Sequence, residues 1–526
     1  MKTNTYKTCR PACFLQALLS FCCLIFMFVC PVALSSANTI DFSLGSEDDN
    51  RAASADTNSD NPVERNKIVL IKSQEDMDDN WNKSDFWSTG KNPDTAKDSI
   101  FIVPGGMRVR SRNNMTTQTF GKESNHNSLY IGYDADGNTI STEKGILHLK
   151  AAVKQDDTVT IHDLVIGNGE IFQGAANAHV TLNGNVTVNG DAVFRLKAEA
   201  TTNTERRSFI VNSIISGGGN ITFLIEDDKD THVSLMSTSS SSNPFTGNVT
   251  IAPNTAVTLS GTDAFCHAAS FTNNGTLYLG ADQTLNNLSG TGTIVVRDHK
   301  LTLFNDQLSQ VSGGIDGEGS IYKTGDGTLQ IITAADGAVR AESFVISSGR
   351  LDMEGYFEGT LRVVNDTIEV EDATTFSPGV GVGTIDIDGD LILADGAVLL
   401  MEIGGTAFES NDQLILNGEV TFQPGSIVQV ALAADSEYTP KEGTLIAVNM
   451  PQVDWRTATF ASDDFTLADY DDVAGLQYIT PIVDPTPKHA PSTKGDTAAA
   501  AVPEPSTWAL LILGIAGLYF IRKKKA

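Results

Sequence analysis

The chain has 526 residues, and its 65 Asp and Glu outnumber its 36 Lys and Arg, which gives a formal net charge of -29. This charge excludes a nucleic-acid-binding protein that works by counterion release, because the field of the protein repels phosphate groups. Hydrophobic residues make up 40% of the chain. That is enough for a core, so we expect a folded body rather than disorder throughout.

Residues 1–37 have the pattern of a secretory signal peptide. Basic residues in the first ten positions precede an apolar run over 14–29, and small residues follow it. We expect cleavage after Ala37, with cleavage after Ser35 as the alternative and an uncleaved anchor as the competing interpretation. Five of the six cysteines lie in this leader, so the mature chain would keep only Cys266 and could form no internal disulfide.

The C-terminal segment 503–526 carries the most specific pattern in the chain. An apolar run over 508–521 is shorter than the roughly 20 residues that span a bilayer comfortably, but flanking aromatic and basic side chains extend its reach. We expect a single transmembrane helix whose basic end lies in the cytoplasm, with a plain type I tail anchor as the simpler alternative. The helix is preceded by Pro503, Glu504 and Pro505 and followed by the membrane-stop cluster Arg522, Lys523, Lys524 and Lys525.

This order of motif, short helix and basic cluster resembles the PEP-CTERM sorting signal of Gram-negative bacteria. The same kind of tail also carries the label "ice-binding protein C-terminal domain". The resemblance is confined to the tail, and it implies recognition by an exosortase, a membrane transpeptidase-like enzyme, at Pro503, Glu504 and Pro505. After export through the translocon, the protein would be anchored transiently in the inner membrane, cut from its helix and delivered to the cell surface or the extracellular matrix.

Between these two ends, the composition predicts two linkers and one long body. Residues 38–66 are polar and acidic and are interpreted as a disordered lead-in, and residues 481–502 are rich in Pro and Ala and are interpreted as a spacer. The body, 67–480, consists of short apolar–polar alternations typical of strands, with almost no helical periodicity. In 179–190 the Asn-Gly pairs are interpreted as turns between strands.

We therefore expect an all-β fold, a right-handed parallel β-helix or solenoid with coils of about 20–25 residues. Gly, Asn and Asp suit the corners of such coils, and Val, Ile, Leu and Thr suit their faces. Stacked β-sandwiches are the alternative, but they would show domain breaks, and none is visible between about 110 and 370.

Three motifs in the body resemble the autotransporter-associated β-strand repeats. Residues 243–251 (NPFTGNVTI), 317–329 (GEGSIYKTGDGTL) and 376–385 (FSPGVGVGTI) follow the order of that family. Upstream, 81–90 (WNKSDFWSTG) is similar to the aromatic cap of related surface proteins. The resemblance implies a parallel β-helix, but the chain departs from the family because it ends in a basic tail after one short helix, where an autotransporter has a membrane barrel.

Candidate catalytic or metal-binding residues are few. Asp386, Asp388 and Asp390 would share one face of a strand and could hold an acid pair, although their place beside Gly389 favours solvated surface. The acids of 226–228 are interpreted as a charged loop.

Two further features could indicate a calcium site or a catalytic cysteine. Residues 134–138 (DADGN) are weakly similar to a calcium loop but fit a tight turn better. Cys266 lies next to His267 and is interpreted as a half-buried structural cysteine rather than a nucleophile. We expect no catalytic residue, no cofactor and no metal.

These observations predict an exported, non-catalytic surface or matrix protein, a scaffold or an adhesin. Its expected partners are the exosortase, the translocon and the membrane during export, and then extracellular polysaccharide or cell-surface glycans. The alternative is a polysaccharide-active β-helix enzyme, which would need a groove of clustered acidic or basic residues across neighbouring coils. A uniform acidic surface without a cleft would favour the scaffold.

Overall fold

The computed structural model describes residues 65–482, apart from gaps at 75–79, 113–115, 151–155, 175–178, 199–206, 228–233, 239–241, 334–336, 366–372 and 472–473 and single positions at 435, 442, 455 and 475. The predicted signal peptide, nearly all of the lead-in, the spacer after residue 482 and the sorting tail lie outside the described residues. Pro503, Glu504, Pro505 and the basic cluster 522–525 lie outside them too. Within the described residues, no helix is long and apolar enough to cross a membrane.

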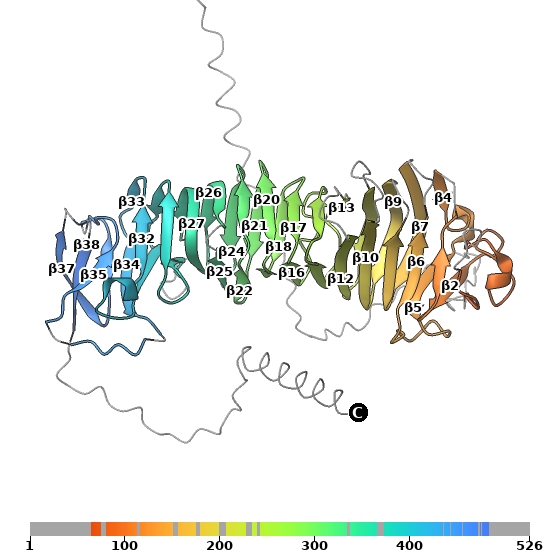
Figure 1. The fold of residues 1–526 in the computed structure, drawn as a ribbon, viewed down its shortest axis with the longest axis horizontal. Coiled ribbons are helices and arrows are strands. Elements are labelled where there is room, and N and C mark those ends of the chain that lie inside the picture. The colour runs from red at the N-terminus through yellow and green to blue at the C-terminus, as the bar shows by residue number, and fades with distance from the viewer. Residues whose placement is uncertain are drawn as a thin grey trace, which may run out of the picture. The chain divides into compact units, whose positions relative to one another are not determined.

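The described residues form parallel β-sheets, as the sequence predicts (Figure 1). One sheet has eight strands, each pairing in parallel with the next. Its strands are β3 (Arg108–Arg110), β6 (Gly145–Leu149), β8 (Gly169–Gln173), β10 (Asp191–Ala198), β12 (Asn220–Asp227), β14 (Asn248–Ile251), β16 (Ser270–Asn273) and β19 (Leu288–Ser289).

The other sheet contains thirty strands in several runs. Its longest run begins at β1 (Asn66–Val69) and continues through β2 (Ser99–Pro104), β5 (Ser128–Tyr133), β7 (Asp156–Ile166), β9 (His179–Val188), β11 (Arg207–Ser216), β13 (Ser234–Thr238), β15 (Ala256–Leu259), β17 (Thr276–Leu279), β20 (Thr293–Arg297), β23 (Ile315–Gly317), β26 (Val339–Ile346), β27 (Arg350–Val363), β29 (Thr384–Asp388) and β32 (Gln413–Leu416). The short β4 (Thr117–Thr119) pairs with β7.

Two further runs share β27 with this one. The first contains β18 (Gln283–Asn286), β21 (Lys300–Phe304), β24 (Ser320–Thr324), β30 (Leu391–Leu393) and β33 (Val420–Phe422). The second, called here the groove sheet, contains β22 (Ser309–Val311), β25 (Thr328–Ile332), the start of β27, β28 (Thr375–Pro378), β31 (Val398–Ile403), β34 (Ile427–Leu432) and β36 (Thr459–Ala461). Short 3-10 turns are η1 (Ser84–Phe86), η2 (Glu123–Asn125) and η4 (Phe408–Ser410).

The spacing between paired strands varies along the chain. Thr272 is in register with Ser289, 17 residues later, whereas Asp191 is in register with Asn220, 29 residues later. Both offsets lie outside the expected spacing of about 20–25 residues. The strands keep their register while the connecting loops differ in length, because loop length costs little free energy.

The core is built from the inward positions of each strand. Phe194 is in register with Phe223, and their rings stack with centroids 5.7 Å apart. Both are buried, as is Phe271 two strands further on. At the start of the body, Trp81 and Trp87 are fully buried, and Trp87 packs edge-on against Phe101 of β2 with ring centroids 4.8 Å apart. The aromatic segment 81–90 therefore supplies core packing at the first strands.

Outward positions of the eight-strand sheet carry a hydrogen-bonded column of polar side chains. Asn220 Nδ2 donates to Asp191 Oδ1 at 2.8 Å, Asn248 Nδ2 donates to Asn220 Oδ1 at 2.9 Å, and Ser270 Oγ donates to Asn248 Oδ1 at 2.8 Å. Each cross-strand pair of this kind contributes roughly 0.2–1 kcal/mol and disfavours a slipped register. A second column in the same register holds Thr222, Thr250, Thr272 and Ser289.

The prediction of a turn between strands at Asn183-Gly184 is wrong. Both residues lie inside β9, which pairs in parallel with β7 on one side and β11 on the other. Gly184 has φ +116°, and a Cβ there would meet the carbonyl oxygen of Ile161 at 1.8 Å. The glycine thus allows a close approach next to the register shift between Ile161 and Asp163 of β7, without reversing the chain. Asn189-Gly190 does form the turn between β9 and β10.

The parallel stacking ends at the C-terminal side of the body. β38 (Leu476–Pro481) lies antiparallel between β35 (Ile446–Asn449) and β37 (Phe465–Asp471). Because a parallel stack leaves an open edge that can pair with other chains, such antiparallel strands act as a cap.

Candidate functional site

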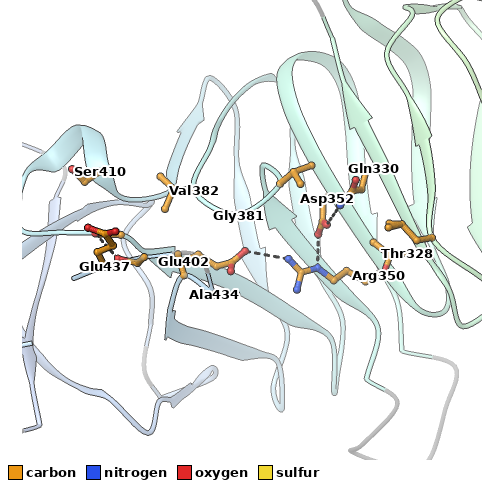
Figure 2. A pocket seen from close by; sticks show the side chains of 15 residues that line it. Thr328, Gln330, Arg350, Asp352, Gly381, Val382, Glu402, Ser410, Ala434 and Glu437 are labelled. Carbon is orange, nitrogen blue, oxygen red and sulfur yellow. Dashed lines mark hydrogen bonds and ion pairs between the residues drawn. The ribbon is translucent and has the colours of Figure 1, made fainter. Parts of the chain in front are cut away.

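A groove of about 710 Å³ lies over the outward face of the groove sheet. Figure 2 shows its lining, which mixes charged, hydroxyl and apolar side chains. The lining residues are Leu308, Thr328, Gln330, Arg350, Asp352, Val380, Gly381, Val382, Glu402, Gly404, Ser410, Ala433, Ala434, Ser436 and Glu437.

Local alternation places the charged residues of this groove. In β27, Leu351 and Met353 point into the core, so Arg350 and Asp352 lie on the outer face. In β31, Met401 and Ile403 are fully buried, and Glu402 between them faces outward. The groove therefore gathers polar side chains from strands whose other face belongs to the core.

Arg350 links two carboxylates at the floor of the groove (Figure 2). Its Nε donates to Asp352 Oδ1, and its Nη2 donates to Glu402 Oε2 at 3.1 Å. The side chain of Asp352 keeps only 4% of its surface exposed and that of Glu402 only 10%, whereas Arg350 keeps 33%. Burial raises the pKa of Asp352, while the Arg350 guanidinium and a hydrogen bond from Gln330 Nε2 at 3.3 Å favour its charged form.

A third carboxylate, Asp412, supports the floor from the loop after β31. It is fully buried, and its two oxygens accept the backbone N–H of Gly383 at 2.8 Å and of Glu402 at 2.7 Å. Burial raises the pKa of Asp412 to about 8, although these two hydrogen bonds oppose the shift. Asp412 thus holds the backbone that carries Glu402, and it is not among the residues that line the groove.

The remaining lining offers both hydrogen-bonding and apolar surface. Thr328 and Gln330 come from β25, on the strand beside Arg350 and Asp352. Leu308 is 65% exposed and Val380 is 38% exposed, so both present apolar surface at this site. Among the described residues, no group of three or more His, Cys, Asp or Glu is placed to hold a metal ion.

The predicted acid group Asp386, Asp388 and Asp390 lies elsewhere, on open surface. Asp386 and Asp388 lie on the outward face of β29, where Asp388 accepts hydrogen bonds from Tyr356 Oη at 3.2 Å and Asn417 Nδ2 at 2.9 Å. Asp390 follows in the turn and accepts the backbone N–H of Glu419 at 2.9 Å. None of the three lines the groove, which agrees with the interpretation as solvated surface.

The interpretation of 226–228 as a charged loop is wrong for Glu226. This residue lies near the end of β12 and pairs with Arg195 of β10, whose Nη2 also lies 2.6 Å from Glu170 Oε1 on β8. Asp228 lies outside the described residues. The ladder connects three neighbouring strands, so it serves the stacking of the sheet.

The segment 134–138 forms the predicted tight turn. The N–H of Gly137 donates to the carbonyl of Asp134 at 2.8 Å, and Asp136 Oδ1 accepts the N–H of Asn138 at 2.8 Å. The backbone N–H groups of Asn138 and Thr139 both donate to Asp136 Oδ1 and lower the pKa of Asp136. The ammonium of Lys67 donates to the carbonyl of Asp136 and to Asn138 Oδ1, so a lysine provides the positive charge at this turn.

Cys266 is half-buried, as predicted, and the neighbouring His267 is exposed.

Lys323, in the predicted repeat motif 317–329, is a buried cation that sequence inspection overlooked. It is 0% exposed, and its Nζ donates to the carbonyls of Gly327 at 2.7 Å and Ser348 at 3.0 Å, and also to those of Thr324 and Gly325. Burial lowers its pKa to about 8. The lysine therefore joins the turn after β24 to the turn before β27.

Comparisons with known proteins agree with the expectation for the tail. A family model described as the PEP-CTERM protein-sorting motif matches residues 501–525. No curated protein and no solved structure matches the chain. The sequence resemblance is thus confirmed for the tail, which indicates an exported protein that an exosortase processes and that is sorted to the cell surface.

Proposed function

We propose that the chain is a non-catalytic scaffold or adhesin that displays a right-handed parallel β-helix at the cell surface. The observation that carries this proposal is the sorting motif at 501–525 on a chain whose described body consists mainly of parallel strands. The signal peptide, the spacer and the short membrane helix predicted around that body would suit the same route of export.

The pairing pattern supports the β-helix. From β5 to β17, the chain alternates strand by strand between the larger sheet and the eight-strand sheet, and each strand pairs in parallel with the next strand of its own sheet. A solenoid requires this alternation, because each coil adds one strand to each face. The resemblance of 243–251, 317–329 and 376–385 to autotransporter passenger repeats supports the same architecture.

The contacts that the carboxylates of the groove make support a role in binding over a role in catalysis. Asp352 and Glu402 are tied to one guanidinium, and Asp412 is tied to two backbone N–H groups. A general acid or base must present its proton or lone pair to a reacting atom. Here the carboxylates are engaged in holding the groove together.

The test of surface display is intact mass and cell fractionation of the chain in an exosortase-containing host. A variant with Pro503→Ala, Glu504→Ala and Pro505→Ala is compared with wild type, and Pro485→Ala with Pro487→Ala in the spacer serves as the matched control. We expect the wild type and the control to lose the tail and appear at the surface or in the medium. The motif variant should stay full-length in the membrane. An uncut tail in all three proteins would overturn the proposal and leave a plain membrane anchor.

A polysaccharide-active enzyme is the second candidate, and one observation favours it. The groove gathers Arg350 and Asp352 from β27 and Glu402 from β31, two strands further along the groove sheet, and such an enzyme needs charged residues clustered in this way. The discriminating measurement is the release of reducing ends, or of unsaturated uronate, from a panel of polysaccharides. Release by wild type that Glu402→Gln abolishes, and that the exposed control Glu358→Gln retains, would replace the scaffold with the enzyme.

A further inference from the structure

We propose that the groove over β25, β27 and β31 binds a short stretch of glycan composed of neutral or amine-bearing sugars. This inference rests on the proposed surface function and names the class of partner. It concerns one site, formed by Thr328, Gln330, Arg350, Glu402 and Glu437 with Leu308 and Val380 at its apolar part.

The size of the groove suits such a ligand. Its volume of about 710 Å³ lies within the roughly 300–1,000 Å³ of typical small-molecule sites. The lining comes from several strands, and Gly381, Val382, Ala433 and Ala434 complete it. The site is thus a shaped hollow in the fold and not a flat charged patch.

The hydrogen-bonding groups of the groove match sugar hydroxyls. A guanidinium has five N–H donors, and the ion pairs of Arg350 with Asp352 and Glu402 use Nε and one N–H of Nη2. Because the side chain keeps 33% of its surface exposed, the other N–H groups can donate to a ligand oxygen. The Thr328 hydroxyl and the Gln330 amide lie on the strand beside it. Hydroxyl groups that both donate and accept suit this mixture.

The apolar part of the groove matches the C–H faces of sugar rings. Leu308 and Val380 are large apolar side chains that stay 65% and 38% exposed, and Val382, Ala433 and Ala434 add to the same lining. Covering this surface with a sugar ring would remove apolar area from water. A ligand with only charged groups would leave that area exposed.

The charge of the groove selects among glycans. Three carboxylates, Asp352, Glu402 and Glu437, oppose the single cation Arg350, and the whole chain carries -29. A uronate ligand would bring a further negative charge next to these groups, whereas a protonated amino sugar would be attracted and a neutral sugar would meet no penalty. We therefore expect uronate chains to be rejected.

The test measures the binding of four defined tetrasaccharides by calorimetry to the processed protein, or to the full chain in detergent if the tail is uncut. The probes are cellotetraose, chitotetraose, the deacetylated glucosamine tetramer and tetragalacturonate, and an array of neutral, amine-bearing and uronate glycans extends the panel. Arg350→Lys keeps the charge but removes the planar fork, and Leu308→Ser changes an exposed side chain that the fold does not need. Their matched controls are Arg340→Lys, in the exposed ion pairs with Asp316 and Glu358, and Leu445→Ser, which is 57% exposed outside the groove.

We expect at least one neutral or amine-bearing glycan to bind. Both groove variants should raise its Kd about tenfold or more, and both controls should leave the Kd unchanged. The proposal is overturned if no such glycan binds across the panel, if uronate chains bind best, or if the groove variants behave like the controls. An uncut tail together with groove-dependent binding would reject surface sorting and keep the glycan site. Surface sorting without any glycan binding would reject the glycan site and keep the proposal of surface sorting.

Discussion

Arg350 and Glu402 are 52 residues apart in the chain, yet Nη2 of one lies 3.1 Å from Oε2 of the other. β28 lies between their strands, since it pairs with β27 on one side and β31 on the other. The ion pair therefore spans three neighbouring strands, and it brings the carboxylate of Glu402 to the same guanidinium as Asp352.

Removal of this guanidinium should destabilise the protein strongly. Arg350→Ala leaves two nearly buried carboxylates without their cation, and we expect the free energy of unfolding to fall by about 3 kcal/mol or more. Arg340→Ala removes an arginine that also joins two carboxylates, but its side chain is 49% exposed, so the expected loss is under about 1 kcal/mol. Urea denaturation at neutral pH measures both, and equal losses would contradict the role of burial.

The contribution of Asp412 to stability should depend on pH. Its pKa is raised from 3.8 in the unfolded chain to about 8 in the fold. Between these values the native state holds the proton more tightly, so this contribution is fully present below pH 3.8, falls as the pH rises and is lost once the pH passes about 8. The unfolding free energy of wild type should therefore decrease relative to that of Asp412→Asn from pH 5 to pH 8.5. A difference that stays constant or increases with pH would contradict this.

The buried Lys323 should contribute more to stability than an exposed lysine in the same part of the fold. Lys323→Met removes the donors for the carbonyls of Gly327 and Ser348, and unsatisfied buried carbonyls should cost about 2–4 kcal/mol. Lys300→Met, whose exposed ammonium lies over the Tyr322 ring at 5.4 Å, should cost less than about 0.5 kcal/mol. Thermal denaturation compares the two variants, and hydrogen exchange should show faster exchange at residues 324–327 only in Lys323→Met.

Gly247 should tolerate no side chain, unlike its neighbour in the preceding coil. A Cβ at Gly247 would lie 1.6 Å from the carbonyl oxygen of Gly219, so Gly247→Ala forces adjacent coils apart and should cost about 3 kcal/mol or prevent folding. At Gly218 the nearest atom to an added Cβ is Thr246 Oγ1 at 3.5 Å, an ordinary contact. Gly218→Ala should therefore change stability by less than about 1 kcal/mol, as measured by the apparent melting temperature and soluble yield. Similar losses for both would contradict the close-approach role.

The strands of the body could be predicted from the sequence because one face of each strand is apolar. In β17, the buried Leu277 and Leu279 alternate with Thr276 and Tyr278, which is the apolar–polar alternation that predicts a strand. The pairing of strands could not be predicted in the same way, because paired residues are 17 positions apart at one place and 29 at another. At Asn183-Gly184 the sequence favoured a turn, but the parallel neighbours on both sides require a continuous strand.

Only part of the groove could be predicted from the sequence. The alternation of Arg350 and Asp352 with apolar residues shows that they lie on an outward face. The contact between Arg350 and Glu402 depends on the register of three strands. The hydrogen bonds that Asp412 makes beneath it depend in addition on loops of unequal length. The acids chosen from sequence, Asp386, Asp388 and Asp390, have the right alternation but lie on a surface where no groove residue joins them.

The buried Lys323, which joins two turns, has a consequence for a protein that works outside the cell. A bound metal ion at the junction between the turns near residues 325 and 348 would leave when the surrounding water is dilute or contains chelators. The ammonium of Lys323 is covalently attached to the chain, so its local concentration does not depend on the medium. This junction can therefore stay closed in fresh water, in brine or in a matrix that sequesters divalent ions.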